Sequence, residues 1–475
     1  MMGSYDKTGG LSWLGIIRLG LVQTALGAIV VLTTSTLNRI MVVEYGLVAM
    51  LPGALVGFHY AVQMSRPRWG YGSDVGGNRT RWIIGGMAVL SQGGALAALG
   101  TALMGTYFWT GLLVSIVAFA LIGLGVGASG TSLLTLLATK VAPSRRPAAA
   151  SIVWIMMIAG FVVTAITAGA QLDPYTPLRL VMVSSSVSVI AFIVALLAVL
   201  GIEKGGQQTA PVQKPKVKAK PNFRAAFAEV WSEPRARQFT IFVFVSMLAY
   251  SAQDLILEPF AGLVFAYTPG ESTQLAGMQN GGVMAGMIIV AICGSALARL
   301  STLGALGRLL GSMRFWAVGG CLASALAFLG LALASKIGPA WHLQANVFVL
   351  GLANGAFAVA AIGSMMGLAG EGTAGREGTR MGLWGASQAV AFGLGGFLGT
   401  VAIDIARAIA GNEATAYQAI FMVEGALFVV SAIIAAKVAP SAALGAGAET
   451  QTPEQSSTPI SNFRPGSQPG LTAAE

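Results

Sequence analysis

Long apolar runs separated by short polar segments make up most of the chain. A helix that crosses a membrane needs about 20 mostly apolar residues, because each residue adds about 1.5 Å and the hydrocarbon core is about 30 Å thick. Twelve runs of about this length follow one another. They predict transmembrane helices at residues 17–38, 47–65, 82–104, 108–138, 148–170, 178–201, 238–266, 275–298, 313–335, 341–369, 379–407 and 416–437.

One polar segment, residues 202–237, divides this pattern near its middle. It carries eight Lys and Arg residues against three Glu residues, and six apolar runs lie on either side. Many transporter folds are built from two such halves. The predicted fold is an all-α membrane protein with four parts: a six-helix N-terminal half (1–201), the basic linker (202–237), a six-helix C-terminal half (238–438) and a disordered tail (439–475).

Composition and charge indicate lipid as the main solvent. The 475 residues are 55% hydrophobic and 10% charged, whereas a soluble domain carries about 25% charged residues. The net charge of +10 favours cytoplasmic loops under the positive-inside rule over nucleic-acid binding. With the N-terminus inside, 24 of the 28 Lys and Arg residues fall on the cytoplasmic side. Both termini and the linker are therefore expected in the cytoplasm.

The linker offers two interpretations. Phe223, Phe227 and Trp231 fall on one face at helical spacing, which is typical of a short helix lying on the membrane surface. Its lysines would then be drawn to anionic lipid. A solvated loop explains the same composition equally well.

Signals for catalysis are missing from the sequence. It has no nucleotide-binding loop, no zinc-ligand spacing and no nucleophile constellation, and Cys293 and Cys321 lie inside apolar runs. The chain is expected not to be an enzyme. Repeated Gly-xxx-Gly spacings, such as Gly282/Gly286 and Gly351/Gly355, indicate helices that pack closely.

The polar loop between the second and third runs carries a recognisable motif. It reads Gly70-Tyr-Gly-Ser-Asp74-Val-Gly-Gly77-Asn-Arg79. Gly70, Asp74, Gly77 and Arg79 resemble the cytoplasmic loop motif of the major facilitator superfamily, although Val75 and Thr80 replace the usual basic residues. A short carboxylate at this place can cap a helix N-terminus. Together with twelve helices and a central linker, the resemblance implies a major-facilitator-like fold.

A narrower resemblance extends from the first to the eleventh run. It rests on Asn38-Arg39 and His59 to Pro67, on Gln253-Asp254 with Glu258, and on Arg376-Glu377 followed by Trp384 and Gln388. These segments are similar to the PucC/LhaA family of phototrophic bacteria, also called the bacteriochlorophyll delivery family. The loop Asp74-Val-Gly-Gly77 is most similar to the LhaA branch, the assembly factors of the core light-harvesting complex.

The resemblance implies a role in assembling antenna complexes rather than ordinary solute export. Members deliver bacteriochlorophyll to antenna polypeptides or hold these polypeptides during insertion. The implied partners are the antenna α and β polypeptides and the reaction centre, with chlorophyll synthase and the membrane insertion machinery as further candidates. The implied location is the inner, intracytoplasmic photosynthetic membrane.

Polar residues inside the runs are the candidates for function, since ionisable groups in lipid are costly. In major facilitator folds, helices one, four, seven and ten line the central cavity. Helix one offers Asn38 and Arg39, helix seven offers Gln253, Asp254 and Glu258, and helix ten offers Asn354. Asp254 and Glu258 share one helix face. An ion pair between Arg39 and one of these acids that locks the halves together is the structural alternative to substrate or proton handling.

Three further acids, Glu44, Asp404 and Glu424, lie nearer the ends of their runs and are expected to be solvated or to extend toward the membrane surface.

His59 is the candidate ligand for the magnesium of bacteriochlorophyll. It lies midway through the second run, whereas the other histidine, His342, lies at a predicted helix start. A neutral imidazole can supply one axial donor to a metal. A hydrogen bond to a neighbouring helix is the alternative role for His59. Overall, the sequence favours an assembly factor that binds or passes bacteriochlorophyll, and the rival is a proton-coupled transporter that uses Asp254 or Glu258.

Overall fold

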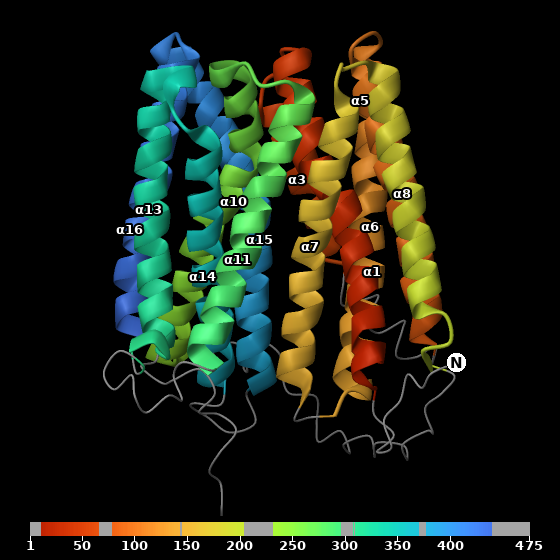
Figure 1. Ribbon diagram of the computed structural model, residues 1–475, viewed down its shortest axis with the longest axis vertical. Coiled ribbons are helices and arrows are strands. Elements are labelled where there is room, and N and C mark those ends of the chain that lie inside the picture. The colour runs from red at the N-terminus through yellow and green to blue at the C-terminus, as the bar shows by residue number, and fades with distance from the viewer. Residues whose placement is uncertain are drawn as a thin grey trace, which may run out of the picture.

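The computed structural model describes residues 11–65, 78–142, 145–203, 231–295, 307, 309–369 and 377–438. Long helices lie side by side along one axis and form a bundle (Figure 1). Eleven of them are long and apolar enough to cross a membrane, and a twelfth, α3, is described over only 14 residues. The prediction of an all-α fold with twelve membrane helices is confirmed.

The helices begin and end close to the predicted runs. The first half contains α1 (Trp13–Val31), η1 (Leu32–Thr36), α2 (Leu37–Arg39), η2 (Ile40–Glu44), α3 (Met50–Gln63), α5 (Arg79–Met104), α6 (Phe108–Lys140), α7 (Arg146–Leu172) and α8 (Pro177–Val199). The second half contains α10 (Pro234–Phe265), α11 (Pro269–Ser295), α13 (Met313–Ile337), η7 (Gly338–Ala340), α14 (Leu343–Ala369), α15 (Glu377–Ala410) and α16 (Glu413–Val438).

The first helix is longer than predicted. The segments α1, η1, α2 and η2 continue one another from Trp13 to Glu44, six residues beyond the predicted end. Polar residues in this stretch do not stop the helix, because the hydroxyls of Thr33 and Thr34 both donate to the Val30 carbonyl, at 2.8 and 3.0 Å. A hydroxyl that bonds to its own helix hides its polarity from lipid.

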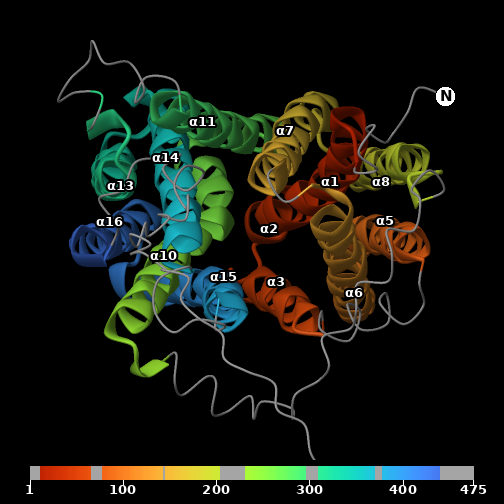
Figure 2. The same cartoon turned by 90° about the horizontal axis from the view of Figure 1, so that it is seen from below.

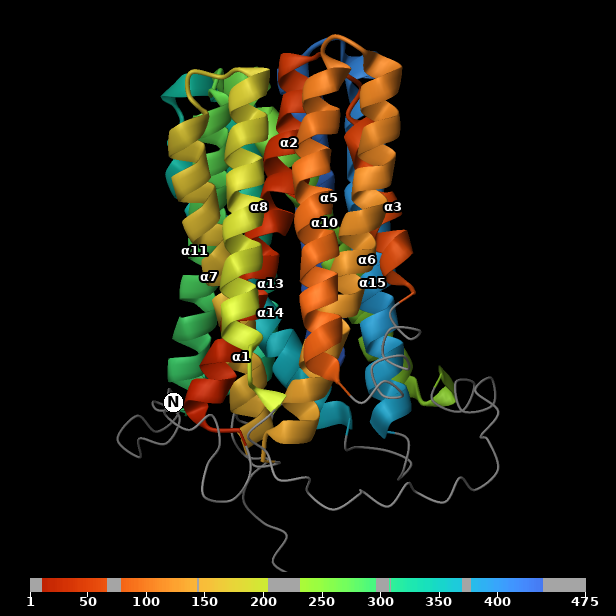
Figure 3. The ribbon, with the colours of Figure 1, turned by 90° about the vertical axis from the view of Figure 1, so that its right-hand side faces the viewer.

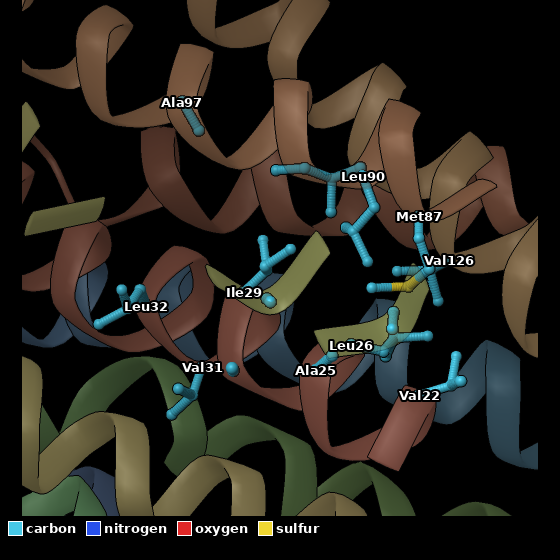
Figure 4. Close-up of a cluster of buried hydrophobic side chains, with 14 of the residues drawn as sticks. Val22, Ala25, Leu26, Ile29, Val31, Leu32, Met87, Leu90, Ala97 and Val126 are labelled. Carbon is cyan, nitrogen blue, oxygen red and sulfur yellow. The ribbon is translucent and has the colours of Figure 1, made fainter. Parts of the chain in front are cut away.

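Viewed along the bundle, the helices form two groups that meet along two seams (Figure 2). One seam pairs α7 with α11, and the other pairs α3 with α15. Each half buries its own apolar core. In the N-terminal half, side chains of the first helix interdigitate with those of α5 and α6, as shown for Leu26, Ile29, Leu90 and Val126 (Figure 4).

Two ends of the bundle are distinguished below. At the short-loop end, brief connections join the helices, at residues 45–49, 105–107, 173–176, 266–268, 338–342 and 411–412. At the linker end, α8 ends and α10 begins. The two ends lie at opposite extremes of the long axis (Figure 3).

The Gly-xxx-Gly spacings of α11 and α14 face one another. A Cβ atom on Gly282 would meet the backbone of Phe348 and Leu352, and one on Gly355 would meet the backbone of Val283. Absence of a side chain therefore lets the two helices touch backbone to backbone, which is how membrane helices pack without a hydrophobic driving force.

Candidate functional site

Polar contacts between the two halves centre on the first helix. Two π-helical turns, η1 and η2, flank Asn38 and Arg39 in this helix. A π turn contains an extra residue, so it rotates the following side chains relative to a regular α-helix, and such turns occur often at functional sites. Here they bring Asn38 and Arg39 to the seam with α10.

Asn38 completes a hydrogen bond that Pro259 removes from α10. In a regular helix the N–H of residue 259 would donate to the carbonyl of Leu255, but proline has no N–H. The Asn38 side-chain amide donates to that Leu255 carbonyl instead, at 2.6 Å. Asn38 is only 1% exposed, so it joins the halves rather than lining an open cavity as predicted.

Arg39 joins the halves through a different partner from the one predicted. It forms its ion pair with Glu44, one turn along the same helix, and its other terminal nitrogen donates to the Tyr267 carbonyl at 2.6 Å. Tyr267 follows the end of α10, where helix carbonyls lack partners and a cation is stabilised. The predicted ion pair between Arg39 and Asp254 or Glu258 is wrong, because the salt-bridge acid is Glu44; Arg39 contacts the other half through the Tyr267 carbonyl instead.

Glu258 lies one turn above Asp254 and is 2% exposed. It faces Ser35 and Arg39 of the first helix, yet neither carboxylate oxygen makes a hydrogen bond of normal geometry with a described residue. The neighbouring Gln253 is fully buried with both amide atoms in the same condition. Burying such groups without partners costs free energy, so Gln253 and Glu258 are unfavourable for stability where they lie.

Glu424 was expected near a solvated helix end, and that expectation is wrong. It is 2% exposed, lies within range of the charge of Asp254, and its carboxylate likewise has no hydrogen-bond partner among the described residues. Asp254 lies eleven residues before the end of α10, and Glu424 lies eleven residues after the start of α16. Both are thus about 17 Å from the short-loop end, at the middle of a core about 30 Å thick.

The other two acids that lie near the ends of their predicted runs, Glu44 and Asp404, both have partners. Glu44 is paired with Arg39, and Asp404 accepts hydrogen bonds from the backbone of α3. Neither is simply solvated.

Aromatic side chains from both halves pack together near Asp254. The rings of Tyr60 and Phe392 are 6.0 Å apart, and those of Tyr250 and Phe392 are 5.9 Å apart. Tyr60, Tyr250, Phe392 and Asp254 are all partly exposed. We call these four residues the central layer. Sequence reasoning missed its aromatic members, although Tyr250 precedes Asp254 by four residues and so shares its face.

His59 is buried and already hydrogen-bonded. Its ring is 2% exposed, and Nε2 lies 2.7 Å from the Gln63 amide nitrogen on the same helix. A macrocycle has no open approach to this ring in the conformation described. The burial favours the alternative role, a hydrogen bond within the bundle, and Gln63 of the same helix is one partner.

Asn354 does not line the interface between the halves, contrary to the prediction. It is fully buried, and its side-chain oxygen accepts a hydrogen bond of 2.9 Å from the Ser324 hydroxyl. The bond joins α14 to α13, two helices of the same half. A polar pair of this kind holds neighbouring membrane helices together.

The family-like segments are only partly described. Gly70, Asp74, Gly77 and Arg376 lie outside the described residues, and Glu377 begins α15. The backbone N–H groups of Arg79 and Thr80 donate to Glu203, so a carboxylate does cap α5. Trp384 packs edge-on against Phe239 at 4.9 Å, and Gln388 lies half-buried beside Met247. Both hold α15 against α10.

A cleft of about 630 Å³ lies between the halves at the short-loop end. Arg39, Glu44, Asp173 and Tyr267 are among the residues that line it. Beside it, the hydroxyls of Tyr45 and Tyr175 are 2.9 Å apart. Burial raises the pKa of both tyrosines, so both stay neutral and hydrogen-bonded near pH 7.

The sequence matches a family model over most of its length. The model described as PUCC protein matches residues 36–443. The chain belongs to the PucC protein family.

Curated relatives agree with this assignment. The chain is 51% identical to the "Bacteriochlorophyll synthase 44.5 kDa chain" of Rhodobacter capsulatus, over 90% of this chain and 96% of that protein. It is 27% identical to "Protein PucC" of the same organism, over 88% of this chain and 90% of that protein. The narrower resemblance to the LhaA branch stays a prediction, since these names do not test it.

Solved structures show the same architecture. A bacterial homologue of the human lysosomal transporter Spinster, described as inward-facing and unoccupied, superposes with a TM-score of 0.62, at 15% identity over 90% of this chain and 96% of that one. The nucleoside transporter NupG gives 0.61, at 15% identity over 90% and 99%. The major-facilitator-like fold is confirmed, and identities this low show the fold alone.

Proposed function

We propose that this chain is a non-catalytic assembly factor for photosynthetic light-harvesting complexes, which binds or delivers bacteriochlorophyll or holds antenna polypeptides during assembly. The observation that carries the proposal is the 51% identity, over nearly the whole of both chains, to a protein named as a bacteriochlorophyll synthase chain. Membership of the PucC family supports the same assignment. The proposed cargo is the pigment, and the proposed partners are the antenna α and β polypeptides, the reaction centre, chlorophyll synthase and the insertion machinery.

The central layer has chemistry that suits such a cargo. A bacteriochlorophyll is a flat, largely apolar ring whose magnesium takes an axial donor. Tyr60, Tyr250 and Phe392 offer aromatic faces from three helices, and Asp254 offers a carboxylate oxygen one helical turn from Tyr250. We therefore propose that the pigment contacts this layer rather than His59.

The proposed location is the inner photosynthetic membrane, with both termini and the linker in the cytoplasm. Eleven described helices that can span a membrane support a multi-pass protein, and the distribution of Lys and Arg supports this orientation.

A deletion of the gene in a phototrophic host tests the proposal. We expect membranes of the deletion strain to lose antenna absorption in the near infrared while total bacteriochlorophyll synthesis continues, and the intact gene to restore the bands. Unchanged antenna bands at every light intensity would count against an assembly role. Loss of all bacteriochlorophyll, with its precursor accumulating, would instead favour a part in synthesis.

Proton-coupled transport is the second candidate, and one observation favours it. Asp254, Glu258 and Glu424 lie within the membrane, and none forms an ion pair with a described residue. Carboxyl groups placed this way are typical of proton pathways. Uptake of a solute into proteoliposomes that depends on a pH gradient, with no pigment bound, would support this candidate over the first.

A further inference from the structure

Two carboxylates at the short-loop end reach from one half to a helix start in the other. The first is Asp404 of α15, whose two oxygens accept hydrogen bonds from the backbone N–H groups of Ala49 and Met50, at 3.0 and 2.7 Å. These residues begin α3. Arg407, which also binds Glu413 and the Tyr417 hydroxyl, lies 3.3 Å from Asp404 and holds it in place.

The second is Asp173, which directly follows α7. One oxygen accepts a hydrogen bond from the Gly270 backbone at 3.2 Å, and the other accepts one from the Thr268 hydroxyl at 2.6 Å. Thr268 and Glu271 form a capping box at the start of α11, because each accepts the backbone N–H of the other. Asp173 thus binds a helix start that is already ordered.

The two contacts are equivalent under the internal repeat of the fold. Counted along each half, α7 and α15 are the fifth helices, and α3 and α11 are the second helices. In each contact a carboxylate of a fifth helix binds the start of the second helix of the opposite half. Helix N-termini expose N–H groups without partners and carry partial positive charge, which stabilises an anion there.

The contacts of Asp173 and Asp404 join the two halves at the short-loop end of the bundle. Further hydrogen bonds between the halves join Thr36 to Thr273, Asn38 to Leu255 and Arg39 to Tyr267. We propose that Asp173 and Asp404 are paired latches which hold the short-loop end shut, and that releasing both opens a path from that end to the central layer. This proposal does not depend on the assembly role.

Distances between spin labels on the two halves test the latches. Labels on Thr106→Cys and Lys336→Cys, two exposed sites at the short-loop end of opposite halves, are measured by pulsed electron resonance in lipid nanodiscs, with Cys293 and Cys321 replaced by alanine. For Asp173→Ala with Asp404→Ala we expect a longer-distance population that the parent lacks. Each single variant is expected to raise the ratio of open to closed molecules at least tenfold, because each removes hydrogen bonds to a charged group.

Thr176→Ala is the matched control. Thr176 also caps a helix at this end, through the Arg179 backbone at 3.1 Å, but within one half. It is expected to leave the distances unchanged. If the alanine variants fail to fold, Asp173→Asn with Asp404→Asn keeps the side-chain shape and removes the charge. Parent-like distances in a folded double variant would overturn the proposal, as would an equal shift in the Thr176→Ala control.

Discussion

At the scale of single residues, polar groups in this protein compensate for one another across the seam between the halves. Pro259 leaves the Leu255 carbonyl without its helical donor, and Asn38 supplies a donor from the other half. In lipid no water is present to donate a hydrogen bond to this carbonyl. Asn38 and Pro259 together therefore hold the first helix at a fixed depth against α10, which neither residue would do alone.

This compensation predicts coupling between the two residues. Asn38→Ala is expected to lower the free energy of unfolding, measured in detergent, by about 1 kcal/mol. In a Pro259→Ala background the helix regains its own N–H donor to Leu255, so the same substitution is expected to cost much less. An equal cost of Asn38→Ala in both backgrounds would show that the proline is not the reason for the bond.

Removing the charge of Glu44 and of Glu424 is expected to affect stability differently, because the two glutamates have different surroundings. Glu44 balances the buried Arg39, whereas Glu424 is buried with no cation partner among the described residues. Glu44→Gln is expected to destabilise the protein by about 2 kcal/mol, less than a fully buried pair because Glu44 is 30% exposed. Glu424→Gln is expected to leave stability unchanged or to raise it. Thermal unfolding of both variants is the measurement, and the reverse order of melting temperatures would contradict this view of the two sites.

The sequence identified most of these polar residues but not their partners. Asp254 and Glu258 share a face because helical spacing requires it. That Arg39 pairs with Glu44, and that Glu424 is buried within range of the charge of Asp254, depends on contacts between helices that are far apart in the chain. Spacing within one helix contains no information about such contacts.

At the scale of helices, close backbone contact decides which glycines matter. On α11, Gly282 faces the backbone of α14, while the adjacent Gly281 has no atom within 4 Å of the place where a Cβ would stand. Both glycines belong to Gly-xxx-Gly spacings in the sequence, and only the three-dimensional contact separates them.

Alanine at these two adjacent positions is expected to have different effects. Gly282→Ala should cost about 1–3 kcal/mol of stability, because backbone atoms of α14 would have to move. Gly281→Ala should be neutral or slightly stabilising, because alanine favours the helix. Melting temperatures in one detergent provide the comparison. Equal loss in both variants would mean that the contact between α11 and α14 is not close in the native protein.

At the scale of the whole molecule, hydrogen bonds join two six-helix groups at the short-loop end, and acids at mid-depth have no hydrogen-bond partner among the described residues. The number and order of the helices follow from the apolar runs, since lipid sets both their length and their composition. The central layer does not follow from them. It combines Tyr60 of one half with Tyr250 and Phe392 of the other, and only folding brings these helices together.

The absorption spectrum of the protein itself tests the central claim most directly. The tagged chain is isolated under gentle extraction from cells that make bacteriochlorophyll, beside an unrelated twelve-helix protein with the same tag from the same membranes. The account predicts a bacteriochlorophyll band that stays in constant proportion to the chain through a second column, and that weakens in Asp254→Asn at normal protein level. A spectrum no different from that of the unrelated protein would contradict the claim that this chain handles the pigment.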